Sequence, residues 1–361
     1  MKVARTLGFA AMAAFALVTL ALAADVAPKF EIDTSWPKPL PNNWIFGQIG
    51  GIFVDKDDNV WISQRPRTVN DRDKRAERGD KAICCYTAPS VVEFNQTGEV
   101  VKAWGGPKTA QGYDWPQNEH GMFVDYKGNV WIGGNGENDG MLLKFTNDGK
   151  FLMAIGKSAA QTNSLDRTRV GRAADMVVDP ATNELYVADG YFNHRVVVFD
   201  ADKGTYKRSW GAYGEKPAAS GPYDPNAAPA RQFYDVSCVK IARDGMVYVC
   251  DRVGDRIQVF QKDGKFVKEA FISKSTLGDG SVWDIAFSND PQQRFLFVAD
   301  GHDKKVFVVR RDTLEVVSSF GDGGRLPGQF YGVGSIAVDS KGNVYTGETY
   351  EGKRVQKFVS K

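Results

Sequence analysis

The chain has 361 residues, a length that suits one large β domain better than two separate domains. Its 46 basic and 44 acidic residues nearly balance, and without Lys2 and Arg5 the 46 basic residues fall to 44, equal to the acidic count. Such a balance gives no reason to expect nucleic-acid binding, and no stretch beyond the N-terminal segment is apolar enough to span a membrane.

The N-terminal segment has the three parts of a secretory signal peptide. A short basic start is followed by an apolar stretch, residues 7–22, and by Ala21-Leu22-Ala23 as a cleavage signal. We therefore expect residues 1–23 to be removed on export and residues 24–361 to form a secreted, periplasmic domain.

Residues 52–358 contain six copies of one unit. Residues 176–211 show it best, as four short runs rich in Val, Phe, Tyr and Trp, separated by Asn, Asp and Gly turns. The copies begin at Ile52, Met122, Met176, Val239, Ile285 and Ile336. Repeats of this length predict an all-β, six-bladed β-propeller with four-stranded antiparallel blades.

The last copy contains only three strands before the chain ends, which would leave an unpaired sheet edge. Residues 29–33 alternate apolar and polar side chains ahead of the first copy. We predict that this N-terminal strand completes the last blade and closes the ring.

A dense run of mixed charge, residues 65–81, follows the second strand of the first copy. Such runs are usually solvated surface loops, although a long loop can also serve as a lid over a site.

The four cysteines are Cys84, Cys85, Cys238 and Cys250, and export permits disulfides. Cys238 and Cys250 lie on adjacent strands of one hairpin, so they could form a cross-strand bridge. Cys84 and Cys85 could bridge each other only through a small ring, and they could instead reach Cys238 or hold a soft metal. We expect structural disulfides, but the sequence leaves the pairing open.

Propeller topology brings the starts of the inner strands and the loops after the second strands to one mouth of the central channel. Convergent polar groups in a concave place are typical of a binding or active site. The side chains that could bind or react there are Arg65, His120, Asp175, Tyr191, Arg252, Trp283 and Asp284.

His120 replaces the small residues found at the matching starts of other blades, so it is a candidate metal ligand or acid–base group. Asp175, Asp284 and Trp283 are candidates for substrate binding. The two aspartates could instead bond channel-facing amides or hold Ca²⁺. His194 and His302 are interpreted as structural and exposed, respectively.

The repeat, with Asn193-His194-Arg195 and closings such as Gly328-Gln329-Phe330, resembles the NHL-repeat propellers. Within them, the mouth segments 64–65, 119–121, 189–191 and 251–258 make it most similar to peptidyl-α-hydroxyglycine α-amidating lyase. That resemblance implies a zinc held by three histidines, beside a tyrosine and arginines that cleave a hydroxyglycine C–N bond. It places His120 at one zinc position, Tyr191 at the catalytic tyrosine, and Arg65 and Arg252 at the substrate side. The other two zinc positions fall on Ser237 and Gly334.

Since zinc catalysis ordinarily needs three protein ligands, three hypotheses follow. The first is a lyase-like enzyme for a small polar or carboxylate-bearing substrate, or a peptide. It either has a rebuilt metal site of His120 with Cys238 or Asp284, or has no metal and uses Tyr191 as a base whose pKa is lowered by the arginines. The second is a calcium-dependent lactonase- or esterase-type hydrolase using Asp175 and Asp284. The third is a non-catalytic propeller that binds a ligand or a protein partner of unknown identity.

Overall fold

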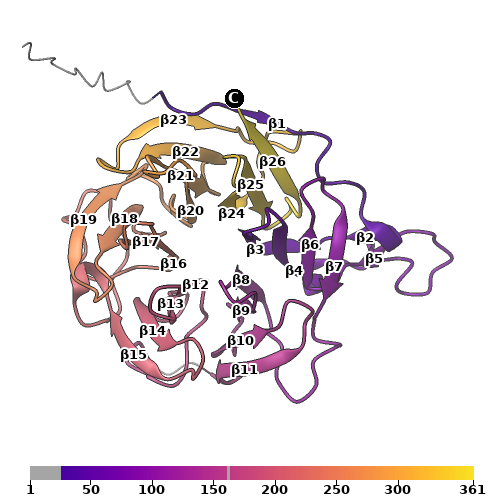
Figure 1. Ribbon diagram of the computed structural model, residues 1–361, viewed down its shortest axis with the longest axis horizontal. Helices are drawn as coiled ribbons and strands as arrows, with labels where there is room; N and C mark the ends of the chain where they lie inside the picture. Colours follow the sequence, from indigo (N-terminus) through magenta and orange to yellow (C-terminus); the bar gives the residue numbers. More distant parts are fainter. Residues whose placement is uncertain (1–25, 161–162) are drawn as a thin grey trace, which may run out of the picture.

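A computed structural model of the chain describes residues 26–160 and 163–361. Six four-stranded antiparallel sheets stand in a ring like the blades of a propeller (Figure 1). The predicted all-β, six-bladed fold is therefore confirmed. The predicted signal peptide, residues 1–23, and the domain boundary at residue 24 lie outside the described residues.

The first three blades follow one another in chain order, each running from an inner to an outer strand. Blade 1 contains β3 (Gln48–Val54), β4 (Val60–Arg65), β6 (Val91–Phe94) and β7 (Val100–Trp104). Blade 2 contains β8 (Glu119–Val124), β9 (Val130–Gly134), β10 (Met141–Phe145) and β11 (Phe151–Gly156). Blade 3 contains β12 (Asp175–Asp179), β13 (Glu184–Asp189), β14 (Arg195–Asp200) and β15 (Tyr206–Trp210).

The remaining blades repeat the same order. Blade 4 contains β16 (Val236–Ile241), β17 (Val247–Asp251), β18 (Arg256–Phe260) and β19 (Phe266–Phe271). Blade 5 contains β20 (Asp284–Phe287), β21 (Phe295–Asp300), β22 (Lys305–Arg310) and β23 (Val316–Phe320). Blade 6 contains β24 (Val333–Val338), β25 (Val344–Glu348), β26 (Val355–Ser360) and β1 (Phe30–Ile32).

The first and last strands of the described residues pair in blade 6, as predicted. Strand β1 pairs antiparallel with β26, with Phe30 opposite Ser360 and Ile32 opposite Phe358. The pairing covers the edge of β26 that the chain's end would otherwise leave open.

An aspartate after the inner strand organises the first hairpin of several blades. Asp55 accepts hydrogen bonds from two turn amides and, at 2.9 Å, from the indole Nε1 of Trp61. Asp125 and Trp131 repeat this contact in blade 2, at 3.0 Å. The two indoles are buried and pack against the inner strand of the following blade. Each indole is buried only because the next blade covers it, so a single blade on its own would expose this aromatic surface to water.

A second repeated contact joins the carboxylate at the end of the second strand to an arginine at or near the start of the third. The arginine then reaches loop carbonyls and ties the blade to its connection. The pairs, with their N–O distances, are Asp189–Arg195 (2.7 Å), Asp251–Arg256 (2.9 Å) and Glu348–Arg354 (2.5 Å).

Blade 5 lacks this arginine. Lys305 pairs in register with Asp300, but its ammonium lies 2.9 Å from Asp322 instead. Asp300 is fully buried, and none of the described residues donates a hydrogen bond to its Oδ2. Burial raises the pKa of Asp300 to about 7. The backbone amides of Asp303 and His302 donate hydrogen bonds to this carboxylate and lower its pKa, but their effect is smaller than that of burial.

Changing Lys305 to arginine should therefore stabilise the protein, by about 1–3 kcal/mol at pH 8. The guanidinium of the new arginine would donate a hydrogen bond to the buried Oδ2 of Asp300. The folded pKa of Asp300 lies above its ordinary value of 3.8, so the wild type loses stability as pH rises from about 4 to 7. The gain should consequently be small at pH 5. Urea unfolding at both pH values measures it, with Lys305→Gln as the control. An equal gain at pH 5 and pH 8 would contradict the assignment.

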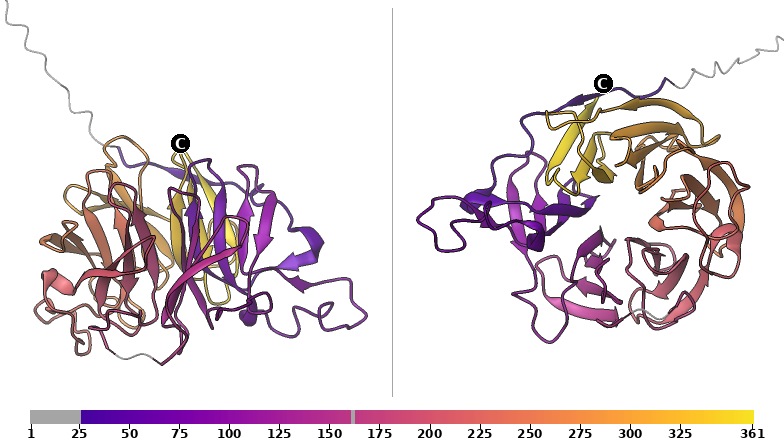
Figure 2. Two further views of the ribbon diagram at one scale, coloured as in Figure 1. Left: turned by 60° about the horizontal axis from the view of Figure 1, so that its bottom comes forward. Right: turned by 180° about the vertical axis from the view of Figure 1, so that it is seen from behind.

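A small lobe extends from blade 1. After the 3₁₀ turn η1 (Pro41–Asn43), β2 (Trp44–Ile45) pairs parallel with β5 (Tyr86–Thr87). The predicted charged run, with η2 (Pro66–Thr68) near its start, lies between β4 and β5. Both views in Figure 2 show the lobe pointing outward from the ring, so the run is a surface loop and does not cover the central channel as a lid.

The described chain has two disulfides. Cys84 is bonded to Cys85, the next residue in the sequence, and Cys238 is bonded to Cys250, which lies opposite it on the adjacent strand. Disulfides are typical of proteins in oxidising compartments. Among residues 26–160 and 163–361, no helix is long and apolar enough to cross a membrane.

Candidate active site

A cavity of about 240 Å³ lies at one mouth of the central channel. Five of the predicted site residues line it, namely Arg65, His120, Tyr191, Arg252 and Trp283. Five further polar side chains line it that were not among the candidate site residues, namely Gln48, Asn118, Asn135, Thr349 and Tyr350. The loops therefore converge at the mouth as the repeat suggested.

Two glycines bring the central pair of this cavity together. Gly190, after β13, passes so close to β16 that any side chain would collide with the backbone of Val236. Gly121 has a left-handed φ of 56° at an irregularity in β8, and a Cβ there would collide with the carbonyl of Ala174. The close approaches place Tyr191 and His120, from neighbouring blades, next to each other at the mouth, with their rings tilted by 59°.

Tyr191 and His120 form a hydrogen-bonded dyad. Nδ1 of His120 lies 2.8 Å from the carbonyl oxygen of Ala174, which can only accept. Nδ1 therefore carries the proton, and Nε2 accepts the hydrogen bond of the Tyr191 hydroxyl at 2.8 Å. The dyad holds one transferable proton between phenol and imidazole.

Both members of the dyad are held in their neutral forms. Burial, together with the charges of Arg65 and Arg252, lowers the pKa of His120 well below its usual value. Burial raises the pKa of Tyr191 and outweighs the opposing effect of the two arginines. Our expectation that the arginines give Tyr191 a lowered pKa was therefore wrong, because the loss of water around the phenol is the larger effect.

Arg252 forms one wall of the cavity. Its Nη2 pairs with Asp235 at 2.8 Å, and its guanidinium lies about 5 Å from the ring centres of Tyr191 (5.1 Å) and Trp283 (4.9 Å). Its Nη1 reaches the Tyr191 hydroxyl at 3.5 Å. Its buried Nε has no hydrogen-bond partner within the described chain. Arg252 thus has one balancing carboxylate and an unused donor.

Arg65 faces the cavity from the opposite side without a balancing charge. Its Nε donates to the carbonyl of Glu119 at 2.7 Å, and its Nη1 donates to Gln48 (2.8 Å) and Thr349 (3.2 Å). The side chain is 6% exposed, and no carboxylate of the described residues lies within ion-pair distance. Burial lowers its pKa. A buried cation held only by neutral groups is a strong site for an anionic ligand.

The donor set does not fit the zinc that the resemblance implies. Ser237 and Gly334 stand at two zinc positions, and the Ser237 hydroxyl donates to the carbonyl of Val282. Cys238 is bonded to Cys250, so it offers no thiolate beside His120. In the described part of the chain, no three His, Cys, Asp or Glu side chains gather as a metal site would need.

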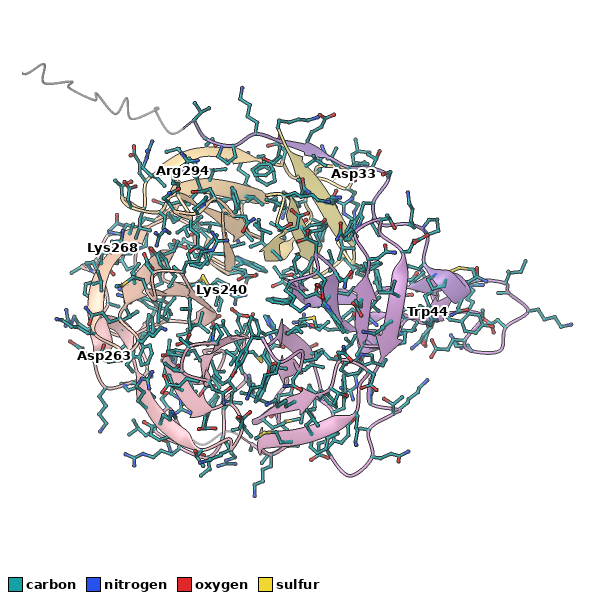
Figure 3. The ribbon with its side chains drawn as sticks, in the orientation of Figure 1. Asp33, Trp44, Lys240, Asp263, Lys268 and Arg294 are labelled. Carbon is teal, nitrogen blue, oxygen red and sulfur yellow. A yellow bond between two sulfur atoms is a disulfide. The ribbon has the colours of Figure 1, made fainter. Side chains whose placement is uncertain are left out.

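Asp175 and Asp284 do not line the cavity beside Tyr191, but they line a small adjoining cavity that shares His120 and Trp283 with it. The ammonium of Lys240 bridges them, at 2.8 Å from Asp175 and 3.1 Å from Asp284. Figure 3 shows Lys240 at the inner edge of the ring. Burial and the neighbouring Asp175 raise the pKa of Asp284 to about 6, with Lys240 opposing. Since a lysine already supplies the cation, this arrangement does not support the calcium site that we considered for the two aspartates.

Two important residues escaped the sequence analysis. Lys240 occupies an inner-strand position that is apolar in the other five blades, where the residues are Phe53, Phe123, Val177, Ala286 and Ala337. This single charged residue at an otherwise apolar position could have identified Lys240 from the sequence. Asp235 could not have been identified in this way, because it lies in the connection before β16. Only the fold shows that it pairs with Arg252.

Fold and site together define a six-bladed β-propeller with a polar, arginine-lined cavity at one channel mouth. Comparison with known proteins agrees with this class, although no family model matches the chain. A solved structure described as a streptogramin B lyase superposes with a TM-score of 0.55 at 13% identity, covering 93% of this chain and 98% of that one. That likeness concerns the fold alone.

Among curated proteins, the chain is similar to peptidyl-glycine alpha-amidating monooxygenase B of Xenopus laevis, at 29% identity over 66% of this chain. It spans only 25% of the length of that relative. NHL repeat-containing protein 3 of Mus musculus is 26% identical over 76% of this chain and 65% of its own length. Peptidyl-alpha-hydroxyglycine alpha-amidating lyase 2 of Drosophila melanogaster is 25% identical over 90% of this chain and 76% of its own length.

The resemblance to NHL-repeat propellers and to the amidating lyases is thereby confirmed. At the level of class, these similarities support a propeller enzyme. Together with the two disulfides, they indicate a protein of the extracellular type.

Proposed function

We propose that the protein is a lyase that cleaves the C–N bond of a small, carboxylate-bearing substrate of the N-acyl-α-hydroxyglycine type. One observation carries this proposal: the Tyr191–His120 dyad, with 2.8 Å between Oη and Nε2, lies between two buried arginines in one cavity. The name of the Drosophila relative supports the choice of substrate class.

The substrate carboxylate pairs with Arg65. This guanidinium is the cation in the cavity with no carboxylate of its own, while Arg252 already shares its charge with Asp235. The Nη2 group of Arg65, which makes no hydrogen bond within the described chain, would hold the carboxylate at one end of the substrate. Trp283 and the guanidinium of Arg252 would then form the wall along which the acyl part lies.

The dyad moves the proton. Tyr191 Oη takes the proton of the substrate hydroxyl while its own proton passes to Nε2 of His120. The carbon–oxygen bond becomes a carbonyl, and the C–N electron pair leaves on nitrogen. The imidazolium returns its proton through Tyr191 to that nitrogen, so the products are a primary amide and glyoxylate. The relay never needs a free tyrosinate, in keeping with the raised pKa of Tyr191.

Incubating the purified protein with an N-acyl-α-hydroxyglycine tests the proposal. We expect glyoxylate and primary amide in equal amounts, faster than in buffer. The matching N-acylglycine, which lacks the hydroxyl, should bind as a competitive inhibitor and release nothing. Binding of both compounds without glyoxylate would contradict the lyase and leave a ligand-binding propeller.

A further inference from the structure

The two disulfides of this protein differ in their accessibility. Cys238 and Cys250 are fully buried in the core between blades 4 and 5. Cys84 is exposed and Cys85 is half-buried, on the lobe that points away from the ring (Figure 1). A thiolate from another molecule could therefore approach the Cys84 sulfur but not the Cys238–Cys250 bond.

The lobe presents apolar side chains on both flanks of the accessible disulfide. Ile83 is 87% exposed and Tyr86 is 43% exposed. Two hydrogen bonds hold the backbone that carries these side chains. The side-chain amide of Asn43 donates to the carbonyl of Ile83 at 3.2 Å, and the backbone amide of Glu77 donates to the carbonyl of Cys85 at 3.4 Å. Ile83 and Tyr86 together therefore offer a partner protein a fixed apolar surface on both sides of the accessible disulfide.

The charge of the lobe also suits thiol chemistry. Residues 66–85 contain six basic and four acidic side chains, and Lys81 lies three positions before Cys84. A positive surplus stabilises a departing thiolate, and it attracts an acidic partner surface.

We infer that Cys84–Cys85 is a thiol–disulfide exchange site for a protein dithiol that docks on Ile83 and Tyr86. The partner's thiolate attacks the Cys84 sulfur, forming a mixed disulfide and releasing the Cys85 thiolate. The partner's second thiol then attacks its own mixed-disulfide sulfur and frees Cys84. Two electrons pass to this chain, which gains two thiols, and the partner becomes the disulfide.

The test compares two reductants on the folded, full-length protein: dithiothreitol as a small dithiol and reduced thioredoxin as a protein dithiol. Alkylation followed by peptide mass spectrometry reports each cysteine separately, so Cys238–Cys250 serves as an internal control. We expect Cys84 and Cys85 to become labelled at least about tenfold faster than the buried pair with either reductant.

The exposed Ile83 supplies the matched variant. Ile83→Ser, which removes the apolar side chain without adding a charge, should slow the reaction with thioredoxin about tenfold and leave the reaction with dithiothreitol unchanged. Equal labelling of both disulfides would overturn the exchange site. A thioredoxin rate unaffected by Ile83→Ser, or an equal loss with both reductants, would overturn the docking surface.

Discussion

Tyr191→Phe should lower kcat for release of glyoxylate from an N-acyl-α-hydroxyglycine by about 10²–10⁴-fold. The phenol oxygen is the group that receives the substrate proton and passes one to His120, and phenylalanine removes only that oxygen. The ring keeps its place against Arg252, so binding of the substrate carboxylate should be retained. Steady-state kinetics and N-acylglycine binding, measured on the same preparation, separate the two effects.

Tyr350 provides the control for that experiment. It lines the same cavity, but its hydroxyl donates to Asp279 at 3.0 Å and has no contact with His120. Tyr350→Phe should therefore change kcat by less than about tenfold. Equal losses of kcat in both variants would mean that the two hydroxyl groups serve substrate binding or the shape of the cavity. Tyr191 would then not be the group that transfers the proton.

Lys240→Met should cause the largest loss of stability of any single change in the channel, about 3–5 kcal/mol. The ammonium bridges Asp175 and Asp284, and methionine would leave two inward-facing carboxylates without a cation. Removing Lys240 takes away what opposes the raised pKa of Asp284, so the folded pKa of that carboxyl should rise further above about 6. The loss should thus be full above neutral pH and should shrink as pH falls toward 5.

Chemical denaturation at pH 8 and pH 5 measures this effect. The triple variant Asp175→Asn, Asp284→Asn, Lys240→Met removes all three charges together, and it should recover part of the stability lost by Lys240→Met alone. A loss that is independent of pH, or a triple variant no better than the single one, would show that Lys240 acts by packing.

The fold could be predicted closely because its determinants are local and repeated. Each blade carries its own turns and apolar runs, and the three-strand final copy required a partner that residues 29–33 supply. The small β2–β5 sheet was missed because each of its strands has only two residues.

The site could be predicted only in part. The mouth residues Arg65, His120 and Tyr191 follow from their positions in the repeat. Distances, ion pairs and net pKa shifts depend on contacts between blades that no local pattern encodes. The bridge from Lys240 to Asp175 and Asp284 joins three blades, and burial, which only the fold reveals, decides the direction in which the pKa of Tyr191 moves.

A double-mutant cycle on glyoxylate release tests most directly whether Tyr191 and His120 act as one proton relay. The variants are Tyr191→Phe, His120→Gln and the two combined, each assayed for kcat/KM with the same N-acyl-α-hydroxyglycine. A single relay predicts that the combined variant is no worse than the more damaged single one, because either change already breaks the path. Losses that multiply would show two independent roles, and full activity in His120→Gln would contradict the relay.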